Sequence, residues 1–132
     1  MSEQKKLPEY HQSSIAMFLK CPRQYMYRYM MNMVMPPKAA LTLGRAFDKG
    51  VNANLIQKIT SRQDAPLELL VDTFSDEFEK ESKTTIWEDE KPGDQKDLGV
   101  KMLTVYHKEA SPKIQPKTVQ DAFRIETDQG YA

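Results

Sequence analysis

Prolines divide this chain into segments that are each about the length of a single helix. Pro22 disfavours helical geometry in Cys21 and suits the first turn of a new helix, so one helix should end there and another begin. The adjacent Pro36 and Pro37 should end that second helix, because proline lacks the backbone N–H that a helix interior needs. The later prolines lie in polar stretches that are typical of turns and loops, at Pro66, Pro92, Pro112 and Pro116.

Between these breaks, apolar residues recur three and four positions apart, which is the pattern of a helix that buries one face. The sequence therefore predicts about five helices, over roughly residues 13–21, 22–35, 39–59, 64–81 and 96–106. Ser13 or Ser14 is expected to cap the first helix. The predicted buried stripe of the second helix is Pro22, Tyr25, Met26, Tyr29, Met30 and Met33. The predicted inward residues of the fifth helix are Leu98, Met102, Val105 and Tyr106.

Two glycines inside the third helix, Gly44 and Gly50, should cost helix stability, and such glycines usually mark close packing of another backbone. Near the C-terminus the period changes, because Val119, Asp121, Phe123 and Ile125 fall on alternate positions. We therefore expect a mainly α-helical chain with one C-terminal β-strand or hairpin, turning at residues 128–130. A lone strand leaves its backbone hydrogen-bonding groups unpaired and therefore needs neighbouring strands. Five helices followed by one strand are thus typical of a domain whose β-sheet begins at that strand.

Composition narrows the functional classes only slightly. Acidic and basic residues balance at 19 each, so nucleic-acid binding would need local basic patches. The single cysteine excludes an internal disulfide and fits a reducing compartment. The sequence shows neither a signal peptide nor an apolar run long enough for a membrane span, so we expect a cytoplasmic protein. Residues 1–10 are expected to be a flexible lead-in, and residues 11–132 to belong to one domain.

Three motifs, in this order and spacing, carry a resemblance to a known family. "SSIAMFLKCPRQYMYRY" resembles the N-terminal signature of RecB-like nucleases of the PD-(D/E)XK superfamily, in which Cys-Pro-Arg precedes an aromatic-rich helix. "GRAFD" resembles the family's glycine followed four residues later by a histidine. "IQPKTVQDAFRIETDQG" resembles the strand that leads into the family's hairpin. The resemblance covers the chain from about Tyr10 to Ala132.

This resemblance implies the N-terminal part of an α/β restriction-endonuclease-like fold and a metal-dependent DNA nuclease. Phosphodiester hydrolysis in recombination, repair or phage DNA processing would use Mg²⁺ or Mn²⁺, with DNA and a helicase or recombination protein as partners, in a bacterial or phage-infected host cytoplasm. The chain departs from the family at Asp48, which replaces the metal-binding histidine, and at Gln120, which replaces a glutamate. The aspartate, Asp/Glu and lysine that name the superfamily have no match in this sequence. The chain is therefore expected to hold no catalytic residue and to be inactive.

Asp48 is the candidate metal ligand, because carboxylate oxygens suit these ions. The alternative is a surface residue paired with Arg45 or Lys49. Four residues could contact DNA, namely Lys20, Arg23, Tyr27 and Arg28. Structural roles for the arginines remain open as well.

Cys21 has three interpretations: a small buried residue at a helix corner, an iron–sulfur ligand, and a reactive thiol beside the cations Lys20 and Arg23, which is the least supported of the three. It matches the position of an iron–sulfur ligand in some RecB-like nucleases, but such a cluster needs four thiolates, and this chain has one. We therefore expect a small, buried residue at a helix corner and no cluster. Two other hypotheses stay open for the whole chain: a non-catalytic helical module that binds DNA or protein, and an unrelated helical bundle.

Overall fold

The computed structural model describes residues 9–127 and 130–131, and the chain is mainly helical, as the sequence predicts. Its residues fall into two compact units, which are described separately. The three-helix unit comprises Pro36–Gln120, and the two-helix unit comprises the described residues before Pro36 and after Gln120. Most of the expected lead-in, residues 1–10, lies outside the described residues. Among the described helices, none has the length and apolar character needed to cross a bilayer.

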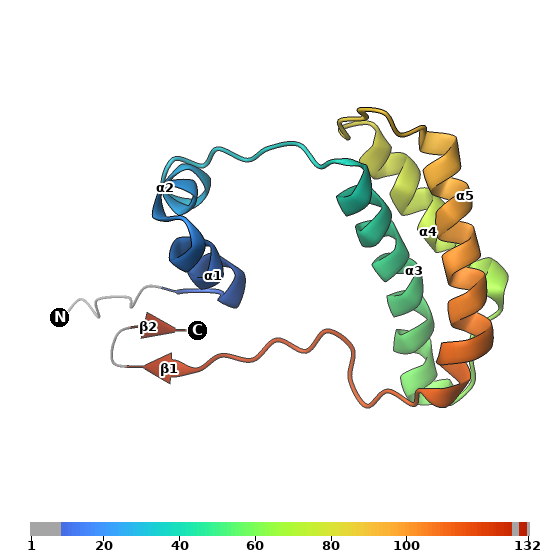
Figure 1. The fold of residues 1–132 in the computed structure, drawn as a ribbon. Helices are drawn as coiled ribbons and strands as arrows, with labels where there is room; N and C mark the ends of the chain where they lie inside the picture. Colours follow the sequence, from blue (N-terminus) through green and yellow to red (C-terminus); the bar gives the residue numbers. More distant parts are fainter. Residues whose placement is uncertain (1–8, 128–129, 132) are drawn as a thin grey trace. The chain divides into compact units, whose positions relative to one another are not determined.

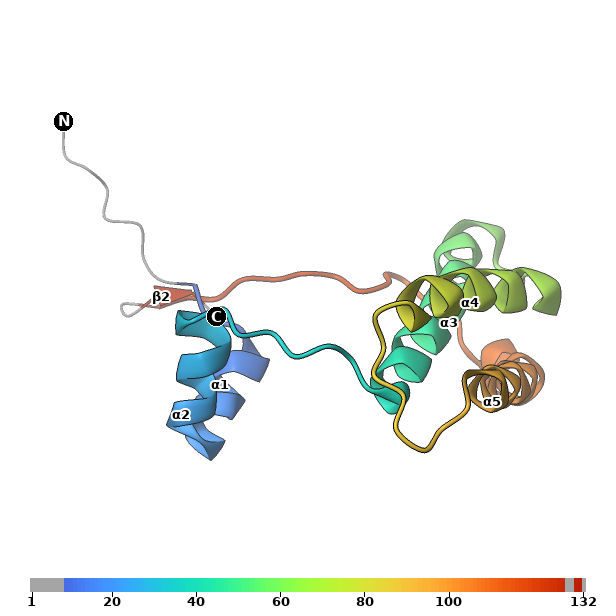
Figure 2. The same cartoon turned by 90° about the horizontal axis from the view of Figure 1, so that it is seen from above.

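The three-helix unit is formed by α3 (Ala39–Ser61), α4 (Leu67–Ser82) and α5 (Pro92–Val105), which lie side by side (Figures 1 and 2). The helix continues beyond α5 as a π turn over Tyr106–Ala110 and a 3-10 turn over Ser111–Lys113. All three helices and the α3–α4 turn contribute to one apolar core, which consists of Leu43, Ala46, Ala65, Leu70, Phe74, Phe78 and Leu103. Trp87, in the loop before α5, packs against this core beside Phe78.

Two glycines allow the three helices to approach one another. A Cβ atom added at Gly99 of α5 would lie 2.1 Å from Cζ of Phe74, so the phenylalanine ring occupies the space of the missing side chain. A Cβ atom at Gly50 of α3 would lie 2.9 Å from the carbonyl oxygen of Leu70. Close packing was predicted for both glycines of α3; it is confirmed for Gly50 and is wrong for Gly44, which has no such neighbour within 4 Å.

The predicted inward face of this helix is confirmed for Tyr106, which packs against the core, and is wrong for the three residues that lie within α5. Leu98, Met102 and Val105 are 44%, 38% and 56% exposed, whereas Gly99 and Leu103 are buried. The contact between Gly99 and the Phe74 ring sets the rotation of α5. Hydrophobic periodicity predicts that the large apolar residues Leu98 and Met102 face the core. It does not predict that a glycine faces the core because it has no side chain.

The two-helix unit begins with α1 (Gln12–Lys20), followed by α2 (Pro22–Tyr25) and a π turn over Met26–Met30. Cys21 between the helices is extended, with φ −157° and ψ 99°, which confirms the break predicted from Pro22. The predicted serine caps are wrong, because His11 takes the N-cap position. Ser14 lies one turn inside the helix, where its hydroxyl accepts a hydrogen bond from the His11 N–H at 3.1 Å and donates to the His11 carbonyl at 2.7 Å.

The predicted buried stripe of the second helix is also wrong. The helical turns end at Met30 rather than at the proline pair, and Asn32 adopts a positive φ of 54° that no helix interior accommodates. No residue of α2 or its π turn is buried, and Met30 and Met33 are 72% and 57% exposed. Apolar spacing identified the helix correctly but did not establish that another element covers its apolar face.

The C-terminal strand is much shorter than its sequence pattern indicates. β1 (Glu126–Thr127) pairs antiparallel with β2 (Gly130–Tyr131), and Asp128 and Gln129 of the predicted turn lie outside the described residues. Residues 119–125 form no strand, although their alternating pattern predicted one. Gln120 has a positive φ of 51°, which interrupts an extended backbone directly after Val119, at the start of the alternating segment.

Candidate metal-ligand position and polar network

Asp48 lies on α3, one turn after Gly44, and its side chain is exposed. Its Oδ2 atom accepts a hydrogen bond from Nδ2 of Asn52 at 3.2 Å and another from Nε2 of Gln120 at 2.9 Å. Asp48 and Gln120 are 72 positions apart in the chain. The structure thus brings together two positions that the sequence resemblance singles out in separate motifs.

The alternative partners considered for Asp48 are engaged elsewhere or are not in contact with it. Arg45 forms an ion pair with Glu81 of α4 at 3.4 Å. Across residues 9–127, no ion pair involves Asp48 or Lys49. Asp48 is therefore a carboxylate held by two amide donors, with no cation beside it in this part of the chain.

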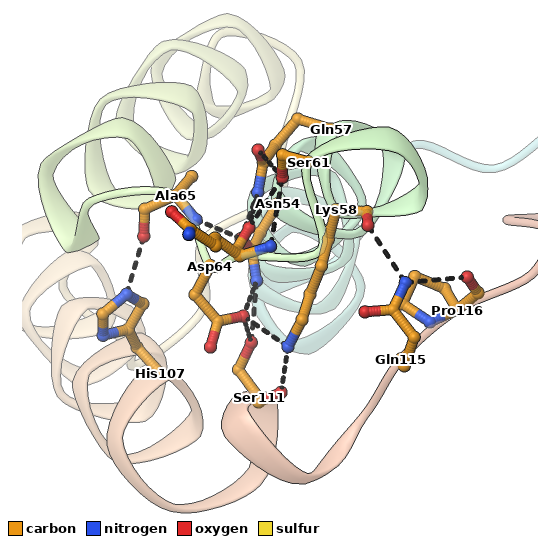
Figure 3. A network of polar contacts seen from close by, with 11 residues as sticks. Asn54, Gln57, Lys58, Ser61, Asp64, Ala65, His107, Ser111, Gln115 and Pro116 are labelled. Atoms are coloured by element: carbon orange, nitrogen blue, oxygen red, sulfur yellow. Dashed lines mark hydrogen bonds and ion pairs between the residues drawn. The ribbon is translucent and has the colours of Figure 1, made fainter.

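A polar network lies near the C-terminal end of α3 and includes Gln115, at the start of the segment that leads to Gln120 (Figure 3). Lys58 of α3 is 4% exposed; its ammonium group donates to Oδ1 of Asp64 at 2.9 Å and to the Ser111 carbonyl at 2.6 Å. Asn54, one turn earlier and fully buried, donates through Nδ2 to the Ser111 hydroxyl at 2.8 Å and to Asp64 at 3.1 Å. These contacts join α3, the α3–α4 turn and the end of α5.

Asp64 is the acceptor at the centre of this network. Burial opposes ionisation of its carboxyl group, but hydrogen bonds from Ser111, Lys58 and Asn54, together with the charge of Lys58, lower its pKa from 3.8 to about 2. Asp64 is therefore ionised across the physiological pH range. The buried ammonium group of Lys58 thus has an anionic partner, as a charge removed from water requires.

The network continues into the chain that leaves α5. Nδ2 and Oδ1 of Asn54 are both engaged, since Oδ1 accepts the Ala65 N–H at 2.7 Å. His107 forms a 2.7 Å hydrogen bond with the Ala65 carbonyl, and Nε2 of Gln115 donates to the Lys58 carbonyl at 3.1 Å. The end of α5 and the segment after it are consequently attached to α3 and its following turn.

Chain geometry explains how this attachment places Gln120 beside Asp48. From Lys58 back to Asp48, α3 rises about 15 Å, at about 1.5 Å per residue. From Gln115 to Gln120, five residues span at most about 17 Å even when fully extended, and the bends in this segment shorten that reach. With contacts at both ends, the segment 115–120 therefore runs alongside α3 in the opposite direction, and the network sets its starting point.

Sequence reasoning did not identify Asn54, Lys58 or Ser111. A signal was present, because Ala46, Gly50, Asn54 and Lys58 follow one another at intervals of four along α3, and all four are buried. A polar and a charged residue on the core-facing line of a helix predict partners from elsewhere in the chain. Which residues supply those partners is a matter of tertiary structure.

The four predicted DNA contacts all lie in the two-helix unit. Lys20 and Arg23 are exposed, Tyr27 is 42% exposed and Arg28 is half-buried. Tyr27 and Arg28 line a groove of about 580 Å³, whereas Lys20 and Arg23 are not part of its lining. Cys21 lies half-buried at the corner between α1 and α2.

The donor set around Asp48 suits a divalent cation only in part. Side-chain oxygens are available from Asp48, Asn52 and Gln120, once the two amides turn their carbonyl oxygens toward an ion. In the part of the chain that is described, no group of three or more histidine, cysteine, aspartate or glutamate side chains converges. A single carboxylate does not make a complete site for Mg²⁺ or Mn²⁺.

Comparison with known proteins returned no match, either to a protein family, to a functionally characterised protein or to a solved structure.

Proposed function

We propose that this chain is the N-terminal helical part of a RecB-like, metal-dependent DNA nuclease domain that acts in recombination, repair or phage DNA processing. The observation that supports the proposal best is the 2.9 Å hydrogen bond between Gln120 and Asp48. The resemblance singles out these two positions from separate motifs, and a chance resemblance gives no reason for them to touch. The Cys-Pro-Arg break at the start of α2 is a second point of agreement.

In this proposal Asp48 is one ligand of the nuclease metal ion. Mg²⁺ or Mn²⁺ supplies Lewis acidity at the phosphate and lowers the pKa of a bound water. This chain offers one carboxylate and two amides, and its sequence matches none of the superfamily's Asp, Asp/Glu and Lys residues. We therefore expect the 132-residue chain to bind Mn²⁺ weakly at Asp48 and to cleave no DNA.

Paramagnetic broadening by Mn²⁺ tests the ligand role directly. In NMR spectra of the full chain, substoichiometric Mn²⁺ should broaden the amide signals around Asp48 and Gln120 first. Asp48→Asn should remove that selective broadening, whereas Asp97→Asn, at an exposed position on α5, should leave it unchanged. Equal broadening in wild type and Asp48→Asn would contradict the proposal.

The coding sequence that follows residue 132 tests the class. A nuclease of this family requires an aspartate and then an Asp/Glu-x-Lys motif on successive strands. Their absence from that reading frame would reject the nuclease assignment. Conversely, Mg²⁺-dependent DNA cleavage by the 132-residue chain, lost in Asp48→Asn, would refute our expectation that its catalytic set is incomplete.

A second function, non-catalytic nucleic-acid binding, is favoured by one observation. Residues 10–37 contain Lys20, Arg23 and Arg28 but no aspartate or glutamate, so this stretch is basic within a chain of zero net charge. DNA binding that weakens steeply with salt, needs no metal and is followed by no cleavage in any longer form of the protein would support this function.

A further inference from the structure

The groove in the two-helix unit combines a cation with aromatic rings. Its volume is about 580 Å³, within the range of about 300–1,000 Å³ that small-ligand sites occupy. Tyr27, Arg28 and Tyr29 line it from the π turn, Gln24 lines it from α2, and Met33 and Met35 line it from the segment that follows. Ser13 and Met17 line it from α1, so a ligand here would meet flat apolar surface, one guanidinium, one amide and one hydroxyl group.

Arg28 is half-buried but has no partner in the part of the chain that the structure describes, where it enters no hydrogen bond and no ion pair. The nearest possible acidic neighbours along the sequence are remote, since residues 10–37 contain no aspartate or glutamate. A guanidinium that is partly withdrawn from water gains most from an anion that it can bind bidentately, such as a phosphate. The groove therefore favours an anionic ligand.

Tyr29 is the exposed end of a row of aromatic rings. Phe18 of α1 meets the edge of Tyr25 at a centroid distance of 5.4 Å, and Tyr25 meets Tyr29 at 5.1 Å with a tilt of 34°. Tyr29 remains 40% exposed and Tyr27 42% exposed. Because Tyr29 is supported from behind by Tyr25, a planar group can extend the row at little cost in side-chain ordering.

Tyr27, Arg28 and Tyr29 are consecutive residues of the π turn, and all three line the groove. The amide of Met31 bonds to the carbonyl of Met26, five residues back, at 3.0 Å. A turn with more residues reduces the angle between consecutive side chains, so Tyr27, Arg28 and Tyr29 project over a narrower arc than they would from an α-helix. Single π turns of this kind are frequent at functional sites.

We infer that this groove binds one unpaired nucleobase and its adjacent phosphate, so that the two-helix unit selects single-stranded nucleic acid. The base stacks on Tyr29 and Tyr27, and Arg28 binds the phosphate. A base inside a duplex has both faces covered by its neighbours, whereas a base in a single strand or a frayed end offers a free face. The choice of nucleic acid as ligand class rests on the proposed function; the groove, the unpaired arginine and the aromatic row do not.

Fluorescence anisotropy of the full chain with labelled oligonucleotides tests this inference in EDTA, so that metal binding plays no part. Wild type should bind a thymidine dodecamer more tightly than a duplex of the same length. Tyr29→Ala and Tyr27→Ala should each weaken single-strand binding about fivefold or more, whereas Tyr29→Phe and Tyr27→Phe should retain it, because the ring face remains. A uridine dodecamer shows whether the site distinguishes DNA from RNA, and binding of either supports the inference.

Arg28→Gln should weaken binding and reduce the slope of log affinity against log salt by about 0.7, the value for one lost phosphate contact with a single strand. Lys80→Gln, at an exposed position on α4 of the three-helix unit, removes the same charge and should change neither quantity. Far-UV circular dichroism of each variant shows whether its helices are retained. The phenylalanine variants keep the inference testable if an alanine variant unfolds.

Equal affinity for single strand and duplex would overturn the inference, as would unchanged binding by the folded alanine variants. Binding of an apolar peptide that is insensitive to salt would assign the groove to a protein partner and would also overturn it. The nuclease proposal is tested separately: Mn²⁺ broadening that is the same in wild type and Asp48→Asn would refute it. That result would leave the single-strand selectivity measured in EDTA unaffected.

Discussion

The two units of this chain use their apolar residues in opposite ways. In the three-helix unit, Leu70, Phe74 and Leu103 are fully buried. In the two-helix unit, Phe18 and Leu19 are 50% and 77% exposed, and Ser14 is the only residue of its helices that is buried. Both regions show helical periodicity, so periodicity identifies a helix and leaves open whether another element covers its apolar face.

Helix length and close approach account for the difference. α3 and α4 have 23 and 16 residues, and glycines at two positions let the helices and the Phe74 ring pack closely. α1 has nine residues and α2 four, lengths at which a helix is marginal without tertiary packing. We therefore expect the three-helix unit to carry most of the stability and the two-helix unit to carry the exposed binding surface.

Truncating one phenylalanine in each unit should give the largest contrast. Phe74→Ala removes a fully buried ring and should lower the free energy of unfolding by about 4 kcal/mol. Phe123→Ala removes a ring that is 85% exposed in the two-helix unit and should change it by less than about 0.5 kcal/mol. Urea unfolding followed by fluorescence of Trp87, the single tryptophan, reports on the three-helix unit. Similar losses in both variants would remove the proposed distinction.

Adding one methyl group to α5 sharpens the contrast within a single helix. Gly99→Ala places a Cβ atom against the Phe74 ring and should lower the unfolding free energy by about 3 kcal/mol, the upper end for overpacking. Gly93→Ala, in the first turn of α5 with no such neighbour within 4 Å, should be neutral or stabilise by up to about 1 kcal/mol. Thermal melting of both variants checks this, and an unaffected Gly99→Ala would show that Phe74 moves freely.

Removing the buried charge of the network should have an intermediate effect. Lys58→Met keeps the aliphatic stem but leaves Asp64 and the Ser111 carbonyl without their shared donor, so the unfolding free energy should fall by about 2 kcal/mol. Lys80→Met, at an exposed position on α4, should leave it within about 0.5 kcal/mol. In NMR spectra, Lys58→Met should also shift the signals of residues 115–120, because the network sets where that segment begins. Unchanged signals of residues 115–120 would show that the network does not determine the position of Gln120.

Acid should produce the smallest effect, confined to the three-helix unit. The pKa of Asp64 is about 2 in the folded chain and lies near 3.8 without the network, so the stabilising contribution is complete above about pH 4. It is lost as the pH falls from 4 toward 2, and amounts to about 1 kcal/mol after allowance for partial solvent screening. Urea unfolding of Asp64→Asn at a series of pH values should lack this component; an identical pH profile would exclude Asp64 as its source.

Much of the secondary structure could be predicted, because its causes are local. The break at Cys21–Pro22 follows from the geometry that proline imposes on its predecessor. The rotation of α5 could not be predicted, because it depends on Gly99 meeting a ring from α4. The strand expected from Val119 to Ile125 failed for a similar reason, since a strand requires a partner and a local pattern cannot supply one.

The same distinction between local and tertiary causes applies to the candidate site. The sequence alone determines the helix that carries Asp48, the basic, acid-free stretch at residues 10–37, and the two motifs whose resemblance singles out Asp48 and Gln120. The contact between Asp48 and Gln120, the network around Lys58 and the exposure of Tyr29 arise from folding. Backbone sterics and helical period act over a few neighbouring residues. Burial and hydrogen-bond partnership depend on segments that the chain brings together from 50 or more positions apart, as with Lys58 and Ser111 or Asp48 and Gln120.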